Sequence, residues 1–306
     1  MRSALTAITC TRYLVQVSPT NRRQAVLPLA AIALLACGGQ AVTPVATPRP
    51  AVGVQEHASA TKAPGGTIHD VTYDSSGRTV SAYLLIPDGK GPFAAIVFAH
   101  WYTGRNGADR HEFVDEATVL LKLGVVSLLP QGQFPWKEDP SGVEHDQAAI
   151  DAQVADFKAG IDVLLEQPGV DPARLAFVGH DYGAMYGALL MARDARIKGA
   201  ALMAGDPIWV TWFATYWQFM KTDADKATYA SRMAAYDPIS VLPMTKASFL
   251  IQFGSSDVYI SRPEADRLVA AVPGDKSVRF YAAGHELNAL AMADRLTWLR
   301  SLLKLP

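Results

Sequence analysis

Hydrophobic and polar residues follow two different periods along the chain beyond residue 66. Short runs that are apolar throughout, such as residues 94–99, are typical of strands that a sheet buries on both faces. Longer segments, such as residues 149–165, repeat apolar residues every three or four positions, as one face of a helix does. These patterns predict strands at residues 67–73, 78–86, 94–99, 125–129, 174–178, 197–203, 248–253 and 277–281.

The order of these elements predicts the fold class. Asp74-Ser75-Ser76-Gly77 is a strong turn signal that joins the first two strands into a hairpin, and the later strands alternate with helices. This order predicts an α/β fold with one mostly parallel, eight-stranded sheet that helices cover on both faces. The predicted helices lie at residues 109–123, 149–165, directly after Asp181, at 264–271 and at 288–303.

An insertion at about residues 206–240 separates two predicted strands. It is rich in aromatic residues: Trp209, Trp212, Phe213, Tyr216, Trp217 and Phe219. Such a stripe fits a buried core, and it equally fits a short lid over a pocket. In the second case Trp209, Trp212 and Tyr216, together with His100 and Trp101, would line the pocket of a small-molecule substrate.

The N-terminal segment predicts export. Arg22-Arg23 precedes an apolar run of about 12 residues, too short to span a bilayer, which needs roughly 20. The run ends in Leu34-Leu35-Ala36-Cys37, which resembles a bacterial lipobox. We expect residues 1–37 to be a signal peptide, lipidated Cys37 to anchor the chain to a membrane of the bacterial cell envelope outside the cytoplasm, and residues 38–66 to be a Pro/Thr-rich tether. A plain signal peptide or an uncleaved anchor are the alternatives.

Composition limits the classes of partner and cofactor that we expect for the remaining domain, residues 67–306. The chain has 306 residues, 50% of them hydrophobic, and a formal net charge of −1, which argues against a nucleic-acid partner. Its two cysteines, Cys10 and Cys37, both precede this domain, so we expect no disulfide there. The histidines have no metal-ligand spacing, and we expect neither a metal nor a cofactor.

The segment Gly179-His180-Asp181-Tyr182-Gly183 carries the strongest chemical signal. It follows the apolar run 175–178 and precedes an Ala/Leu/Met-rich segment, which is the strand–turn–helix context of a nucleophile elbow. Most elbows present a serine, whereas this one presents Asp181. The alternative is an ordinary turn in which Asp181 caps a helix.

Two later loops supply partners for Asp181. Asp257 follows the next-to-last predicted strand and His285 follows the last. The order nucleophile, acid, histidine at these loops resembles the α/β-hydrolase superfamily over about residues 67–306, with a layout similar to the dienelactone hydrolase group. Asp206 is a rival for the acid.

The resemblance also implies an oxyanion hole. Its backbone N–H donors would be those of Tyr182 and, because Trp101 stands where relatives carry glycine, of Tyr102. The elbow itself is similar to the Gly-His-Asp-aromatic-Gly elbows of epoxide hydrolases and haloalkane dehalogenases.

This likeness implies that Asp181 attacks a saturated carbon of an epoxide or, second, of an alkyl halide. The resulting enzyme ester would be hydrolysed by water that His285 activates, with Asp257 holding the His285 ring. Tyr216, Tyr229 and Tyr236 are candidate acids for an epoxide oxygen. With an ordinary histidine pKa, activity would fall below about pH 6.5.

Two other functions stay open. The first is an ester or lactone hydrolase in which His285 activates water directly and Asp181 is not attacked. The second is a ligand-binding protein without catalysis, although a dead site would have no use for the paired Asp257 and His285.

Overall fold

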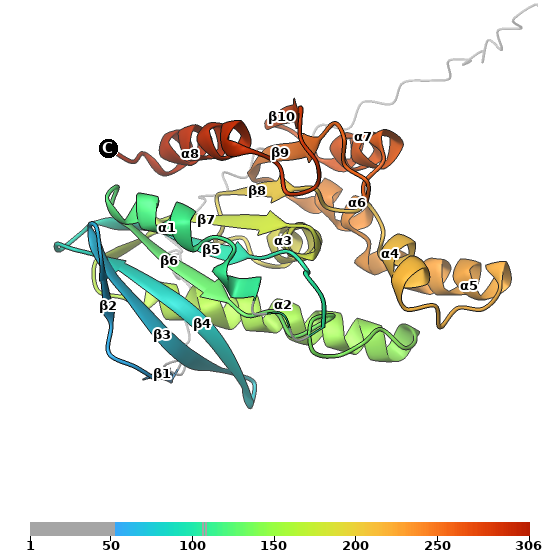
Figure 1. Ribbon diagram of the computed structural model, residues 1–306, viewed down its shortest axis with the longest axis horizontal. Helices are drawn as coiled ribbons and strands as arrows, with labels where there is room; N and C mark the ends of the chain where they lie inside the picture. The colour runs from blue at the N-terminus through green and yellow to red at the C-terminus, as the bar shows by residue number, and fades with distance from the viewer. Residues whose placement is uncertain (1–52, 106, 108) are drawn as a thin grey trace, which may run out of the picture. The chain divides into compact units, whose positions relative to one another are not determined.

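The computed structural model describes residues 53–105, 107 and 109–306. The predicted signal peptide and Cys37 lie outside these residues. Five strands come first along the described chain, and the later strands alternate with helical segments (Figure 1). The strands are β1 (Val54–Glu56), β2 (Thr61–Ala63), β3 (Gly66–Ser75), β4 (Arg78–Pro87), β5 (Phe93–Ala99), β6 (Val125–Pro130), β7 (Val170–His180), β8 (Gly199–Met203), β9 (Ser248–Gly254) and β10 (Lys276–Tyr281).

The helices follow the same alternation. They are η1 (Asp109–His111), α1 (Val114–Leu121), α2 (Val143–Leu165), α3 (Tyr182–Arg193), α4 (Trp209–Tyr216), α5 (Asp223–Met233), η2 (Ala234–Tyr236), α6 (Pro238–Val241), η3 (Leu242–Met244), α7 (Arg262–Ala271) and α8 (Ala289–Leu303). Among the described residues, no helix is both long and apolar enough to cross a membrane.

All the described strands belong to one sheet in the order β1-β3-β4-β6-β5-β7-β8-β9-β10, with β2 paired to β3. β6, β5, β7, β8, β9 and β10 run parallel to one another, and β4 pairs antiparallel with β6. The prediction of a mostly parallel sheet is therefore confirmed. The loops that leave β5, β7, β9 and β10 consequently meet at one edge of the sheet, where ligands of such sheets bind.

The predicted number of strands and the predicted tether need correction. The described part of the chain forms a ten-stranded sheet, not an eight-stranded one, because β1 and β2 add to β3. The domain thus begins by Val54, and a tether cannot extend to residue 66. Both strands are short and mainly exposed, held by backbone hydrogen bonds, so no apolar pattern marks them in the sequence.

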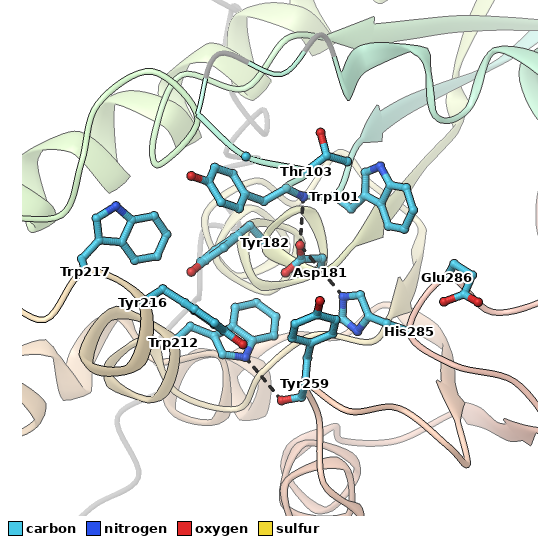
Figure 2. A pocket seen from close by; sticks show the side chains of 12 residues that line it. Trp101, Thr103, Asp181, Tyr182, Trp212, Tyr216, Trp217, Tyr259, His285 and Glu286 are labelled. Carbon is cyan, nitrogen blue, oxygen red and sulfur yellow. Dashed lines mark hydrogen bonds and ion pairs between the residues drawn. The ribbon is translucent and has the colours of Figure 1, made fainter.

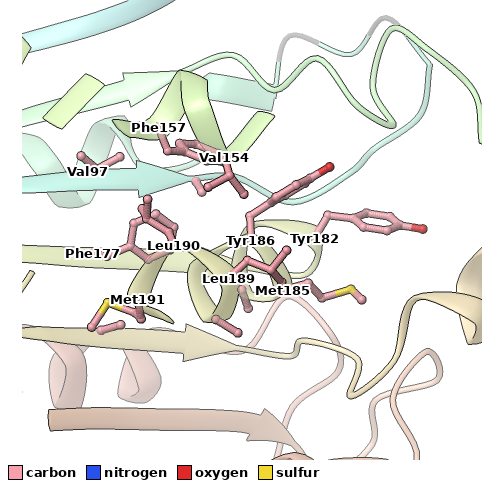
Figure 3. Close-up of a cluster of buried hydrophobic side chains, with 14 of the residues drawn as sticks. Val97, Val154, Phe157, Phe177, Tyr182, Met185, Tyr186, Leu189, Leu190 and Met191 are labelled. Carbon is pink, nitrogen blue, oxygen red and sulfur yellow. The ribbon is translucent and has the colours of Figure 1, made fainter. Parts of the chain in front are cut away.

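The side chains of β5 alternate between two hydrophobic cores, one on each face of the sheet. Ala95, Val97 and Ala99 pack with residues of α2 and α3, as Figure 3 shows for part of that core, and the intervening residues pack with α1 and α8. Burial on both faces explains why this strand is apolar at every position.

The aromatic insertion forms helices α4 to α6 between β8 and β9. Trp209, Trp212 and Phe213 of α4 are buried in the core, whereas Tyr216 at its end is 52% exposed. Both sequence interpretations hold in part, because one helix contributes core on one face and pocket wall on another.

Candidate active site

The turn between β7 and α3 is as tight as the elbow pattern predicts. Asp181 has a φ of 59° and a ψ of −122°, a conformation that non-glycine residues rarely adopt. A Cβ at Gly179 would lie 2.3 Å from the carbonyl oxygen of Gly183, and one at Gly183 would lie 2.0 Å from that of Ala99. Only glycine fits at these two positions, and the turn projects Asp181 from the edge of the sheet.

The Asp181 carboxylate lies between a backbone donor and a histidine (Figure 2). Its Oδ2 accepts a hydrogen bond of 2.8 Å from the N–H of Tyr102, the donor expected from the loop after β5. Nε2 of His285 lies 4.0 Å from the same oxygen. Among the described residues, Oδ1 has no hydrogen-bond partner and is free to meet a substrate.

His285 is held by the acid that the chain order predicts. Its Nδ1 lies 2.9 Å from Oδ2 of Asp257, and Oδ1 of Asp257 accepts the N–H groups of Tyr259 and Ile260. Burial would raise the pKa of Asp257, but the hydrogen bond and charge of His285 outweigh it and leave this pKa below its usual value. The rival, Asp206, does not line the cavity and instead accepts the N–H of Ile208.

The two carboxylates change the acidity of His285. Burial alone would lower its pKa, but hydrogen bonds and charges of Asp181 and Asp257 outweigh burial and raise the pKa to about 9. The resting site therefore contains an imidazolium at neutral pH. The expected loss of activity below pH 6.5 assumed an ordinary histidine and does not apply to this state.

A cavity of about 540 Å³ opens over Asp181 and His285. Seven of its twelve lining residues are aromatic: Trp101, Tyr102, Tyr182, Trp212, Tyr216, Trp217 and Tyr259. Trp101, Trp212 and Tyr216 were expected from the sequence as pocket residues, and Trp217 and Tyr259 were not. Tyr259 lies two residues after Asp257, so its place beside the acid loop is the signal that could have identified it.

Two predicted pocket residues face elsewhere. His100 is buried, and its ring bonds to the carbonyl of Trp101 and the N–H of Gly132, which fixes the loop after β5. Trp209 is buried with its indole N–H bonded to the carbonyl of Tyr236. The polar ring atoms of both residues are therefore bonded to backbone groups and are not available to a substrate in the cavity.

Only one of the three tyrosines predicted as acids for an epoxide oxygen lines the cavity. The hydroxyl of Tyr229 donates to Asp146 and that of Tyr236 to Asp151, and neither residue lines the cavity. Tyr216 does line it, as does Tyr182, whose buried hydroxyl has no partner among the described residues. The ring of Tyr182 extends from the elbow toward Trp212 and Tyr216 in Figure 2.

The donor set does not point to metal chemistry. Within the described ranges, no group of three or more His, Cys, Asp or Glu side chains could hold a metal ion. The site instead combines a carboxylate, a histidine–carboxylate pair and a backbone N–H donor in an aromatic cavity.

Comparison with known proteins agrees with this arrangement. The model of the prolyl oligopeptidase family (peptidase S9) matches residues 146–287, a segment that contains the elbow, Asp257 and His285. The α/β hydrolase GrgF from Penicillium sp. sh18 superposes with a TM-score of 0.58 at 13% identity, covering 77% of this chain and 98% of that one. The chain therefore has the α/β-hydrolase fold, and the segment 146–287 is similar to the prolyl oligopeptidase family.

Other solved α/β-hydrolases share the fold at low sequence identity. Acetyl xylan esterase 1 from Thermoanaerobacterium sp. JW/SL YS485 has a TM-score of 0.66 at 13% identity, over 83% of this chain and 88% of that one. The acetyl xylan esterase from Paenibacillus sp. R4 has a TM-score of 0.66 at 18% identity, over 83% and 90%. No curated protein matches the sequence. Together the family match and these neighbours support a hydrolase.

Proposed function

We propose that this α/β-hydrolase uses Asp181 to attack a saturated carbon of a small organic substrate, with epoxides as the preferred class. The observation that carries the proposal is the geometry of the elbow carboxylate. Oδ2 of Asp181 accepts the Tyr102 N–H and lies 4.0 Å from Nε2 of His285, and the other oxygen faces the cavity.

The chemistry of a carboxylate favours this substrate class. Attack on an ester would have to give a mixed anhydride, but a carboxylate is a far better leaving group than an alkoxide, so the tetrahedral intermediate would expel Asp181 and return to the ester. Attack on an epoxide carbon forms an ordinary ester on Asp181 while the carbon–oxygen bond of the ring breaks. Oδ2 then becomes the ester carbonyl oxygen and keeps its hydrogen bond to Tyr102.

The protonation state of His285 accounts for the proton in both steps. In the first step, the alkoxide from the opened ring takes the proton of the imidazolium. Because the ester has no charge, the pKa of His285 then falls, and the neutral ring removes a proton from water. This water attacks the carboxyl carbon of Asp181. The N–H of Tyr102 stabilises the oxyanion that forms, a contribution of roughly 3–4 kcal/mol. The diol then leaves, and the ion pair of Asp181 and His285 is restored.

Two observations favour epoxides over alkyl halides. A leaving halide accepts no proton, so the imidazolium would have to release its proton to solvent before the second step. In addition, Tyr216 and Tyr259 line the cavity and carry phenol groups, which can donate hydrogen bonds to an epoxide oxygen.

Isotope labelling tests the proposal directly. After a panel of epoxides, haloalkanes and p-nitrophenyl esters has identified a substrate, one turnover in heavy-oxygen water should label the elbow peptide at Asp181, not the product. His285→Gln should trap the ester as an added mass on that peptide, and Asp181→Asn should give no adduct. Label in the product with no trapped adduct would exclude Asp181 as the nucleophile.

A second candidate function is ester or lactone hydrolysis by direct attack of water. The acetyl xylan esterases named above favour it, since these proteins with the same fold are esterases by name. It requires neutral His285, so turnover of esters would rise as the pH approaches 9. Turnover of none of the three panels would favour a ligand-binding protein.

We also propose that Cys37 carries the lipid anchor of an exported bacterial lipoprotein. The lipobox-like Leu34-Leu35-Ala36-Cys37 and the basic pair before the apolar run support this proposal. It concerns the location of the enzyme only, and the catalytic proposal does not depend on it.

A further inference from the structure

A buried carboxylate outside the catalytic cavity connects the loops of the site. Glu112 follows η1, and its side chain is 15% exposed. Oε2 of Glu112 accepts the N–H of Trp101 at 2.7 Å, and Oε1 lies 2.5 Å from Nδ1 of His180. One side chain thus contacts both the loop after β5 and the elbow.

His180 extends this connection to the loop after β10. Its Nε2 donates to the carbonyl oxygen of His285 at 2.9 Å, and only 2% of His180 is exposed. The His180 ring also stacks against Trp101 and His285, with centroid distances of 5.3 and 5.1 Å. Hydrogen bonds and ring contacts both restrict the ring to one orientation.

The two partners of His180 determine where its protons lie. A carbonyl oxygen can only accept a hydrogen bond, and an ionised carboxylate can only accept one. Nε2 of His180 therefore carries the proton that it donates to the His285 carbonyl, and Nδ1 shares a short hydrogen bond with Oε1 of Glu112. The adjoining smaller cavity is also lined by Asp115, Glu116, Glu286 and Arg295, of which Glu116 and Arg295 form an ion pair of their own.

A polar contact of this kind is a weak source of stability, because removing polar groups from water is costly. Its position indicates another role. Trp101, which Glu112 holds, immediately precedes the Tyr102 N–H donor; His180 immediately precedes Asp181; and the third contact is the backbone of His285 itself.

We infer that Glu112, acting through His180, is a positioning residue that fixes Asp181, the Tyr102 N–H and His285 relative to one another. The expected effect on catalysis rests on the proposed function, whereas the expected effect on the arrangement of these three groups does not. Residues that orient metal ligands through hydrogen bonds typically contribute on the order of 10- to 100-fold to activity. We expect an effect of similar size for Glu112.

The experiment compares three variants of the full chain. Glu112→Ala removes both contacts, and we expect kcat to fall at least about tenfold with KM within about threefold. Glu112→Gln keeps an oxygen for the Trp101 N–H and an amide group beside Nδ1 of His180, so we expect kcat within about threefold of the parent. Asp194→Ala is the control, because it removes a buried carboxylate, paired with Arg196, at the far end of α3.

A second measurement does not depend on any substrate. The proton between His285 Nδ1 and Asp257 should give a far-downfield proton NMR signal in the parent, Glu112→Gln and Asp194→Ala proteins, and a weakened or shifted one in Glu112→Ala. Unchanged kcat and signal in Glu112→Ala, or equal losses in Asp194→Ala, would overturn the inference. If no substrate is found, the proposed function fails, and the NMR comparison alone decides the role of Glu112.

Discussion

Nε2 of His285 lies 4.0 Å from Oδ2 of Asp181, whereas Nδ1 of the same ring lies 2.9 Å from Oδ2 of Asp257. The imidazole is therefore held between two carboxylates of different character. The shorter contact is a hydrogen bond that can persist throughout a reaction. The longer one is an ion pair that disappears as soon as Asp181 becomes an ester, so the chemical state of Asp181 controls the basicity of His285.

This relationship predicts the pH behaviour of His285. Its pKa, about 9 in the parent, should fall by at least about one unit in Asp181→Asn, since one neighbouring charge is lost. A raised pKa stabilises the fold fully below the unfolded value of about 6.5, and this contribution is lost as the pH rises through 9. The free energy of unfolding of the parent should thus decline more steeply from pH 7 to 10 than that of Asp181→Asn. Histidine NMR titration and chemical denaturation measure both effects, and equal pKa values in the two proteins would contradict the prediction.

Tyr182→Phe should raise stability without loss of activity. Burial, followed by the charge of Asp181, raises the pKa of Tyr182 well above its ordinary value, so its hydroxyl stays protonated. We expect the free energy of unfolding to stay equal or rise, because a buried hydroxyl without a described partner is removed, and kcat to stay within about threefold of the parent. Tyr236→Phe, whose hydroxyl bonds Asp151, is the control and should show no gain in stability. Chemical denaturation and steady-state kinetics of both variants measure this, and a lower free energy of unfolding in Tyr182→Phe would contradict the prediction.

Asp206 should limit stability at alkaline pH. Burial is the main cause that raises its pKa to about 8, and its Oδ2 has no partner in the described part of the chain. The folded state holds this proton more tightly than the unfolded state, so the contribution to stability is present at low pH and is lost between about pH 4 and 8. Asp206→Asn should therefore raise the free energy of unfolding at pH 8.5 by more than about 1 kcal/mol and change it little at pH 4. A gain of the same size at both pH values would show that the charge of Asp206 is not the cause.

Cys37→Ser tests the lipid anchor. In a bacterial host the full chain should fractionate with membranes and incorporate labelled fatty acid, and the variant should lose the label and be released or remain unprocessed. Cys10→Ser is the matched control and should behave as the parent. A variant that stays membrane-bound and is processed like the parent would contradict the lipoprotein proposal.

Local sequence patterns were enough to predict eight of the ten described strands and the loops that bring Asp181, Asp257 and His285 together. A parallel strand buried on both faces must be apolar, and a tight elbow must place glycine at positions 179 and 183, so both leave a signal in adjacent residues. Because parallel strands end at one edge of the sheet, the loops of Asp181, Asp257 and His285 could be expected to meet. β1 and β2 left no such signal, since they are held through their backbones.

Only the tertiary structure shows the contacts, burial and pKa of these groups. The sequence favoured Asp257 but left Asp206 as a rival acid. It did not show that His100 and Trp209 turn into the core, because these outcomes depend on contacts between distant segments. The same holds for the pKa of His285 and for the link from Glu112 to His180, 68 residues later. The sequence determines which chemical groups reach the edge of the sheet, and packing determines their distances, burial and charge, on which reactivity depends.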